Sequence, residues 1–391
     1  MRPRIPAGVL LGLALAGPVA GGAVPLGLPP LAQTGTAPAT RAQVELGRKL
    51  FMDRRLSHNG TLSCAMCHVP EQGFTSNELA TAVGLEGQTV RRNSPTLYNV
   101  AFVRRLFHDG REFSLENQAW GPLLAANEMG NPSIGHVIER IRGLPDYAGM
   151  FRRAYRSGPD VVTIGRALAA YQRTLLSANS PFDRWRYGGR REAMEASARR
   201  GFALFVGRAG CAACHTLGPR HALLSDGRFH NTGIGYARSM GLRRTHHVPL
   251  APGVSIEVDD SALAAFEAAP PDVGRYEVTL DPADSWAYRT PTLRNVALTG
   301  PYMHDGSLPT LEAVVDFYDR GGIDNPGRSP LVRPLGLSAA EKAELAAFLR
   351  SLTGDNAAAL ARGARRGLGP EAAAPAPAKD ARSRPAGASA Q

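Results

Sequence analysis

Apolar residues recur at helical spacing in several stretches of the chain. Residues 41–51 and 194–206 each carry such a set. Ser338 followed by Glu341 has the form of a capping box, which predicts that a helix begins there. The apolar residues of that helix follow Leu345 at i+3, i+4 and i+7. Because the alternation typical of strands is sparse, the fold class is predicted to be mainly α.

The N-terminus has the pattern of a secretory signal. Arg2 and Arg4 precede a short apolar stretch, residues 9–16, and small residues follow through Ala23. A membrane anchor is the alternative, but the stretch is too short to span a bilayer and is interrupted by proline and glycine. We therefore predict a signal peptide over residues 1–24 and an exported, periplasmic chain that is not transmembrane after cleavage.

Composition changes at both ends of the remaining chain. Residues 25–40 are rich in proline, glycine and threonine, which predicts a linker, and residues 354–391 turn to alanine, arginine, proline and glycine, which predicts a disordered tail. A basic tail that docks a partner is the alternative. The net charge is +11, but no basic run exceeds two residues. The charge therefore does not predict nucleic-acid binding.

All four cysteines lie in two Cys-x-x-Cys-His motifs. The motifs consist of Cys64, Cys67 and His68, and of Cys211, Cys214 and His215. This spacing is the attachment motif of c-type haem, in which two thioethers anchor the macrocycle and the histidine binds the iron. Disulfides or zinc sites are the alternatives. Two motifs from only four cysteines favour two covalent haems.

A second internal repeat indicates a duplication. Residues 94–116 and 290–312 are identical at 11 of 23 positions and share a His-Asp-Gly tripeptide, at His108 and His304. These segments lie 196 residues apart, whereas the haem motifs lie 147 apart. The second half therefore has about 49 additional residues, within 220–288. We predict two cytochrome c-like haem domains, 41–185 and 186–353, of which the second is elaborated.

The two halves differ at one pair of equivalent positions. Twelve residues after the tripeptide, the first half has Pro122 and the second has Tyr318. Proline offers no side-chain ligand, whereas a phenolate oxygen can bind ferric iron. If this segment covers the distal face of each haem, the first iron is open to peroxide and the second is closed by Tyr318. The alternative is that Tyr318 is a core aromatic residue.

Several segments together resemble the bacterial dihaem cytochrome c peroxidase/MauG family. They are the two haem motifs, RNSPTLYN, HDGR and TPTLRNVALT, over roughly residues 40–353. Within the family, the segments DGRFHNTGIGYARS, LAPGV, GRYEVTLDPADSWAYRTPTLRN and FYDRGG are most similar to MbnH-type enzymes. The resemblance implies that haem I binds peroxide in a pocket of Gln118, Pro122 and Glu128. Glu128 would then be the acid–base group for cleavage of the O–O bond. A surface ion pair is the alternative for Glu128.

The chain departs from the family's ordinary peroxidases at three positions. Where they have a methionine ligand to haem II, this chain has Tyr318, and where they have a loop histidine that caps haem I, it has Leu85. Haem I is therefore expected to be open without prior reduction. His108 replaces the usual tryptophan between the haems, which puts electron sharing in doubt. Trp120 is the alternative bridging side chain, and His108 is expected to hydrogen-bond a propionate.

The resemblance also implies one calcium ion between the domains. Its ligands would be the Asn93 side chain and the backbone carbonyls of Thr299 and Pro301, and such oxygen ligands suit calcium.

The function implied is that of an exported dihaem oxidoreductase. Hydrogen peroxide would form a high-valent dihaem state that oxidises an aromatic residue of a partner protein, with an exported copper-binding protein as one candidate. The first alternative is a peroxidase that reduces peroxide with electrons from a small cytochrome or cupredoxin. The second is a non-catalytic dihaem electron-transfer protein.

Overall fold

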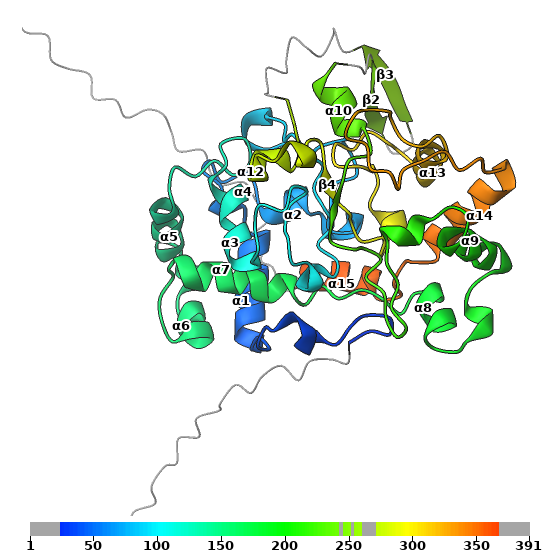
Figure 1. Cartoon of the computed structure of the whole chain (residues 1–391). Helices are drawn as coiled ribbons and strands as arrows, with labels where there is room; N and C mark the ends of the chain where they lie inside the picture. Colours follow the sequence, from blue (N-terminus) through cyan, green and yellow to red (C-terminus); the bar gives the residue numbers. More distant parts are fainter. Residues whose placement is uncertain (1–23, 242–244, 252–253, 260–270, 367–391) are drawn as a thin grey trace, which may run out of the picture.

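The computed structural model of the chain describes residues 24–241, 245–251, 254–259 and 271–366 (Figure 1). Within these residues the fold is mainly helical, as predicted. The predicted signal peptide lies outside the described residues except for its last position. Among the described residues, no helix is both long and apolar enough to cross a membrane.

The helices form two groups that stand side by side in Figure 1, one from each half of the chain. The first group comprises α1 (Arg41–Met52), α2 (Cys64–Cys67), α3 (Leu115–Gln118), α4 (Trp120–Leu124), α5 (Ile134–Arg142), α6 (Met150–Tyr155) and α7 (Val161–Gln172). The second comprises α8 (Pro181–Arg186), α9 (Ala196–Val206), α13 (Leu311–Asp319) and α14 (Ala339–Arg350). The predicted duplication is thus visible as two helical domains.

The helices begin close to where the sequence predicts. α1 and α9 match the predicted helices 41–51 and 194–206 within two residues at each end. The predicted capping box is present at α14, where the Ser338 hydroxyl accepts the backbone N–H of Glu341 and the Glu341 carboxylate accepts the backbone N–H of Ser338. Each bond gives a partner to a backbone N–H group that has none within the helix, because it lies at the helix start.

A glycine sets the spacing of the main helix pair in each half. Gly47 of α1 lies against Ala167 of α7, where an added Cβ would come within 1.8 Å of the carbonyl oxygen. Gly201 of α9 lies against Glu344 of α14 in the same way, with 1.9 Å. A larger side chain at either position would push the helices apart. The two halves therefore repeat one packing arrangement.

Two equivalent asparagines join the halves at their centre. Asn99 and Asn295 are buried and have φ angles of 61° and 60°. The Asn99 side chain bonds both backbone groups of Ser177, at 2.8 and 2.9 Å. The Asn295 Oδ1 accepts the Gly354 N–H at 2.8 Å and the Ser177 hydroxyl at 3.1 Å. Asn99 thus fixes the chain at Ser177, near the end of the first domain, and Asn295 fixes it at Gly354, just after the second domain.

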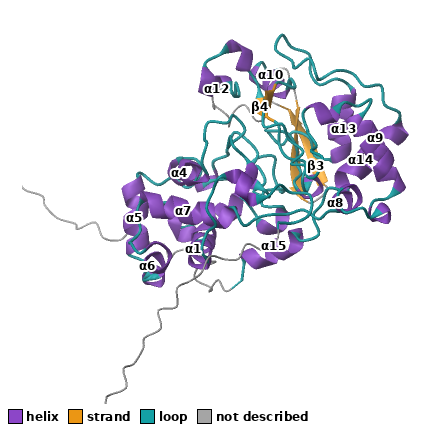
Figure 2. Cartoon of the chain, turned by 60° about the horizontal axis from the view of Figure 1, so that its bottom comes forward, coloured by secondary structure: helices purple, strands orange, loops and turns teal. Residues whose placement is uncertain are grey.

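The additional residues of the second half form a separate layer at one end of the molecule (Figures 1 and 2). The layer contains α10 (Ile234–Ser239), α12 (Tyr276–Thr279), and the antiparallel hairpin of β2 (Thr245–Ala251) and β3 (Val254–Asp259). β1 (Phe229–His230) pairs antiparallel with β4 (Tyr288–Arg289). That pairing brings the two ends of the insertion together and confirms the predicted elaboration.

The predicted tail is wrong for residues 354–366. Residues Ala357–Ala364 form α15, and the side chains of Ala357 and Ala364 are buried in the core of the first half. The Tyr98 hydroxyl donates to the Ala357 carbonyl at 3.2 Å. An isolated helix of this length is only marginally stable in water, and α15 is stabilised by packing on the first half. Composition alone contains no information about that packing, so it predicted disorder. The remainder of the predicted tail, residues 367–391, lies outside the described residues.

The predicted linker, residues 25–40, crosses the second half before entering α1. The Gly27 carbonyl accepts from the Arg294 guanidinium at 2.6 Å and from the Ala222 N–H at 3.1 Å. Arg294 in turn pairs with Asp183 at 2.5 Å, and neither side chain is exposed. The second core includes Phe182, so it begins slightly before the predicted boundary at residue 185.

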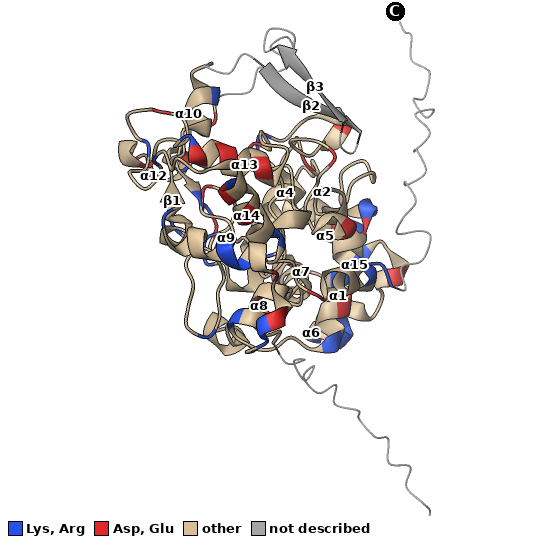
Figure 3. Cartoon of the chain, turned by 90° about the vertical axis from the view of Figure 1, so that its right-hand side faces the viewer, with Lys and Arg blue, Asp and Glu red and all other residues tan. Residues whose placement is uncertain are grey.

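Charged side chains of both signs are interspersed over the face drawn in Figure 3. Near the junction of the halves, Arg92 pairs with Asp109 at 2.5 Å and with Asp272 at 2.7 Å. Arg92 and Asp109 belong to the first half and Asp272 to the insertion, so this buried network ties the insertion to the first domain.

Candidate haem sites between the two halves

A cavity of about 860 Å³ lies between the halves, and both Cys-x-x-Cys-His motifs line it. From the first half the lining includes Cys64, Cys67 and His68, and from the second Cys211, Cys214 and His215. In each motif the backbone N–H of the histidine donates to the backbone carbonyl of the first cysteine at 2.9 Å. The two motifs therefore fold alike, and the structure brings all six predicted attachment residues to one cavity.

The two motif histidines are held as metal ligands usually are. His68 Nδ1 lies 3.1 Å from the Phe74 carbonyl oxygen, and His215 Nδ1 lies 2.8 Å from that of Leu224. A carbonyl only accepts, so Nδ1 carries the proton and Nε2 keeps its lone pair. Burial lowers the pKa of both histidines, which favours the neutral ring that an iron requires.

The cysteines also fit covalent attachment. All four are free of disulfides. Burial raises the pKa of Cys64 to about 12 and that of Cys67 and Cys211 to about 11. All four thiols therefore remain available for covalent attachment to a macrocycle.

Gln118, Pro122 and Glu128 all line the cavity, so the structure brings together the three residues predicted for the peroxide pocket. Burial raises the pKa of Glu128, and the Arg111 guanidinium partly opposes that rise. The Glu128 carboxylate in turn raises the pKa of Cys67, which places it beside the first haem motif. A buried carboxyl that keeps its proton to higher pH is suited to proton transfer near neutrality.

The loop that carries Leu85 is tied to the Glu128 turn. The Leu85 N–H donates to the Glu128 carbonyl at 3.0 Å, and its side chain packs against Gly130. Leu85 is buried and is not among the residues that line the cavity. The residue at this position therefore offers no ligand atom to the first haem motif.

Tyr318 lines the second half's part of the cavity from α13. Burial raises its pKa well above the ordinary value, and the thiols of Cys214 and Cys211 raise it further. Those contributions place the phenol close to the second haem motif. The structure thus puts Tyr318 and Pro122 in one cavity, with Tyr318 beside the motif of its own half.

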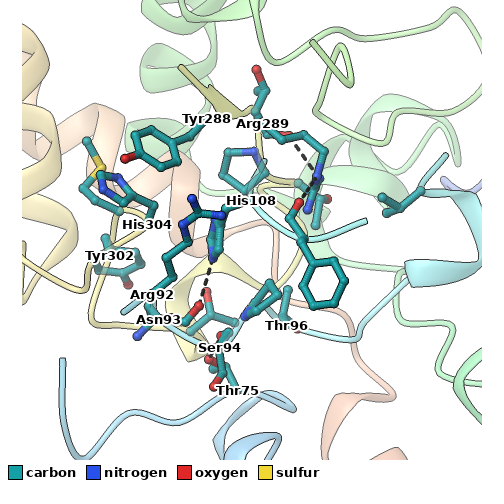
Figure 4. Close-up of a pocket in the computed structure, with 18 of the residues that line it drawn as sticks. Thr75, Arg92, Asn93, Ser94, Thr96, His108, Tyr288, Arg289, Tyr302 and His304 are labelled. Atoms are coloured by element: carbon teal, nitrogen blue, oxygen red, sulfur yellow. Dashed lines mark hydrogen bonds between the residues drawn. The ribbon is translucent and has the colours of Figure 1, made fainter. Parts of the chain in front are cut away.

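The repeated segments meet in the cavity through reciprocal backbone hydrogen bonds. Figure 4 shows the residues that take part, Asn93, His108, Arg289 and His304. The Asn93 N–H donates to the His304 carbonyl, and the Arg289 N–H donates to the His108 carbonyl, both at 2.7 Å. Residues 93 and 289 are themselves equivalent in the duplication. The two halves therefore face each other across an approximate twofold axis, with both His-Asp-Gly tripeptides at the junction.

Arg289 is a site residue that the sequence analysis missed. Burial lowers its pKa to about 10, and no carboxylate of the described residues pairs with it. Its guanidinium donates to two backbone carbonyls, those of Phe107 at 3.2 Å and of Thr290 at 3.4 Å. A buried unpaired cation is costly, and an anionic group such as a haem propionate would relieve that cost. The sequence could have pointed to Arg289 through the duplication, because Arg289 is equivalent to Asn93 in the repeat.

His108 and His304 are neutral residues of the same junction. Burial lowers the pKa of His108 to about 3 and that of His304 to about 4. His108 Nε2 bonds the Asn93 carbonyl at 2.9 Å, whereas His304 Nε2 is buried with no partner among the described residues. His304 is thus the ring with a nitrogen left for a bound group.

The suggestion that Trp120 bridges the two haem motifs is not supported. Its Nε1–H donates to the Val161 carbonyl at 3.3 Å, and Trp120 is not among the cavity-lining residues. Tyr288 occupies the junction instead, stacked on His304 with ring centroids 3.5 Å apart (Figure 4).

Asn93, Thr299 and Pro301, the residues predicted for calcium, line the same cavity from opposite halves. The Asn93 Nδ2 donates to the Ala80 carbonyl at 2.8 Å, which orients Oδ1 as the free acceptor of the amide. This arrangement offers oxygen atoms from both domains, and the ion itself stays a prediction.

Comparisons with known proteins identify the family of the chain. The family described as di-haem cytochrome c peroxidase matches residues 41–191. The methylamine utilization protein MauG of Methylorubrum extorquens is 39% identical over 323 residues, which are 82% of this chain and 81% of that protein. The cytochrome-c peroxidase IdrP1 of Denitromonas iodatirespirans is 40% identical over 338 residues, covering 84% and 86%.

Solved structures with the same fold include a MauG-like protein associated with microbial copper homeostasis. It is 31% identical with a TM-score of 0.65, over 85% of this chain and 94% of that one. The diheme peroxidase BthA from Burkholderia thailandensis is 26% identical with a TM-score of 0.66, over 81% and 87%. Two haem motifs on duplicated helical domains, together with these likenesses, place the chain in the dihaem cytochrome c peroxidase/MauG family of haem-dependent peroxidase-type enzymes.

Proposed function

We propose that this enzyme works in the periplasm and uses hydrogen peroxide to oxidise an aromatic residue of a partner protein. The observation that carries the proposal is the difference between equivalent positions in one cavity. Pro122 offers no ligand atom beside the first haem motif, whereas Tyr318 offers a phenol oxygen beside the second. One half is therefore suited to bind peroxide and the other to remain closed.

Haem bound at both motifs supplies the iron that accepts peroxide and stores oxidising equivalents. His68 and His215 would bind the two irons, and each ring is oriented by a backbone carbonyl. Glu128 takes a proton from the incoming peroxide and returns it to the leaving oxygen, while the Gln118 amide orients the peroxide. The raised pKa of Glu128 supports this role, because its carboxyl exchanges protons closer to neutral pH.

Tyr318 distinguishes this function from simple peroxide removal. Bound to the second iron as a phenolate, Tyr318 would be a hard anionic ligand that stabilises oxidised iron against reduction by a small electron donor. Leu85 supports the same conclusion, because it cannot cap the first site as a histidine would. The oxidising equivalents are therefore held until a protein substrate supplies electrons.

The partner is too large to enter a cavity of about 860 Å³. Its electrons must then cross the protein through side chains. One structural neighbour is associated with microbial copper homeostasis, so an exported copper-binding protein is the first partner to test.

A peroxidase that scavenges peroxide is the second candidate. The 40% identity to the cytochrome-c peroxidase IdrP1 favours it. In that case a small cytochrome or cupredoxin supplies the electrons, and Tyr318 is a packing residue rather than a ligand.

The test is to add one equivalent of peroxide to the oxidised holoenzyme and record visible, near-infrared and EPR spectra. The proposal expects both ferric EPR signals to disappear without prior reduction. Reaction of the first haem alone, or reaction only after reduction, would favour the scavenging peroxidase. Inertness to peroxide would leave the electron-transfer protein.

A further inference from the structure

Tyr288 connects the cavity to the insertion of the second half. It lies in β4 and stacks on His304 with ring centroids 3.5 Å apart and an interplanar angle of 10° (Figure 4). Both rings line the cavity that contains the two haem motifs. Tyr288 is only 8% exposed and is therefore a buried residue.

The outer edge of the Tyr288 ring packs directly on α10. A Cβ added to Gly235 would lie 2.7 Å from the Tyr288 hydroxyl, so the ring touches this helix turn. The next residue, Tyr236, contacts Trp286 edge to face with centroids 5.0 Å apart. Tyr236 and Trp286 are partly exposed. Two aromatic pairs, Tyr288–His304 at the cavity and Tyr236–Trp286 toward the surface, are therefore linked through the Gly235 turn of α10.

The hydrogen bonds of this series favour passage rather than storage of charge. The Tyr288 hydroxyl donates to the Asp272 backbone carbonyl at 3.2 Å, and a carbonyl is too weak a base to take its proton. The Trp286 Nε1–H is buried with no acceptor among the described residues. Neither side chain has a hydrogen-bonded base that would take its N–H or O–H proton when it gives up an electron. An electron vacancy on either is therefore high in energy and is refilled by the next donor outward.

The surface at the outer end has the character of a contact site. Met240, which follows α10, is 56% exposed, and Leu280, which follows α12, is 72% exposed. α10 and α12 lie at the same end of the molecule in Figures 1 and 2. Met240 lies one helical turn after Tyr236, whose carbonyl accepts the Met240 N–H at 2.9 Å. Exposed apolar side chains together with aromatic ones are typical of protein interfaces.

We propose that electrons enter the enzyme at Trp286 and Tyr236 and reach the cavity through Tyr288. This surface of the insertion is then the docking face for a partner protein that presents an oxidisable aromatic residue. The proposal rests on the proposed function, because it requires oxidising equivalents that are held for a protein donor.

The electron balance defines a test without the partner. Each hydrogen peroxide takes up two electrons and two protons and yields two waters. When no partner is bound, Trp286 and one water together supply the two electrons and two protons: a ring C–H bond of the indole is replaced by a C–OH bond whose oxygen comes from the water. The net reaction converts tryptophan and peroxide into hydroxytryptophan and water, so Trp286 gains the mass of one oxygen.

The experiment treats the holoenzyme with excess peroxide and maps oxidised peptides by mass spectrometry. The chain has 3 tryptophans, so Trp120 and Trp185 are internal references. Oxygen is expected mainly on Trp286. Tyr288→Phe keeps the ring but is far harder to oxidise, and it should lower Trp286 oxidation several-fold. The matched control is Tyr302→Phe, another cavity-lining tyrosine whose hydroxyl donates to a backbone carbonyl.

The outcomes separate this proposal from the proposed function. Equal oxidation of all three tryptophans, or Trp286 oxidation that is unchanged in Tyr288→Phe, overturns the route while protein oxidation stands. Oxidation of Trp286 that does not require haem overturns it as well. If the holoenzyme consumes peroxide only with a reduced cytochrome and leaves every tryptophan intact, both proposals fail. Haem absorbance of each variant, compared with the parent, shows whether the sites are still filled.

Discussion

Replacing Glu128 with glutamine tests the chemistry of the first site most directly. The substitution keeps the shape of the side chain and removes only its ability to exchange a proton. The backbone stays fixed in either case, because the residue 128 N–H donates to the Ala125 carbonyl at 3.0 Å and its carbonyl accepts from Leu85. A change in rate is therefore attributable to the lost carboxyl.

The expected loss follows from the position of the carboxyl. A well-placed general acid–base contributes about 10²- to 10⁴-fold in rate, or about 3–5 kcal/mol of activation free energy. Burial raises the pKa of Glu128, and Arg111 opposes the rise only in part. The group must be deprotonated to accept the peroxide proton. The rate of the parent enzyme should therefore fall as the pH drops through this raised pKa, at higher pH than for an exposed glutamate.

Stopped-flow measurement of the peroxide reaction over a range of pH provides the assay. Glu128→Gln should react about 10²- to 10⁴-fold more slowly and should lose the acid limb of the profile. Glu116→Gln is the matched control, because Glu116 lies on neighbouring α3 and is already paired with Arg173 at 2.7 Å. A Glu128→Gln rate close to that of the parent, or an unchanged acid limb, would refute the reasoning.

Three further perturbations test the rest of the site. Tyr318→Phe removes the phenol oxygen and should change the visible and EPR spectra of the second haem, and identical spectra would exclude ligation. Arg294→Met leaves the Asp183 carboxylate buried without its partner and should lower the free energy of unfolding by about 3–5 kcal/mol in urea titrations, whereas an unchanged midpoint would contradict the assigned pair. Chelation of calcium should lower the thermal midpoint by removing a ligand that binds only the folded protein, and Asn93→Ala should abolish that effect. No response of the parent to the chelator would exclude the ion.

The C-terminal segment shows where composition misleads. Residues after 354 resemble a disordered tail because alanine and glycine dominate them. In the folded protein, α15 buries Ala357 and Ala364 against the first half, and Arg365 pairs with Glu71 at 2.5 Å. A helix this short is stabilised by the surface it packs on, and that surface belongs to residues about 250 or more positions earlier.

The sequence by itself determined the chemistry. Two Cys-x-x-Cys-His motifs predict covalent haem because each places two thiols and one imidazole within a single turn. The duplication then made Pro122 and Tyr318 comparable, so the asymmetry of the two halves was readable without coordinates. Such short-range patterns survive in a sequence because the atoms that act together are also close along the chain.

Only the tertiary structure decided what lies between the two motifs. Arg289, Tyr288 and His304 meet there because the halves pack face to face and exchange hydrogen bonds. From the sequence alone, Trp120 was an equally reasonable bridging residue, and its orientation toward Val161 depends on how α4 packs. Contacts between residues that are distant in the chain are set by the packing of whole domains, and no local pattern encodes them.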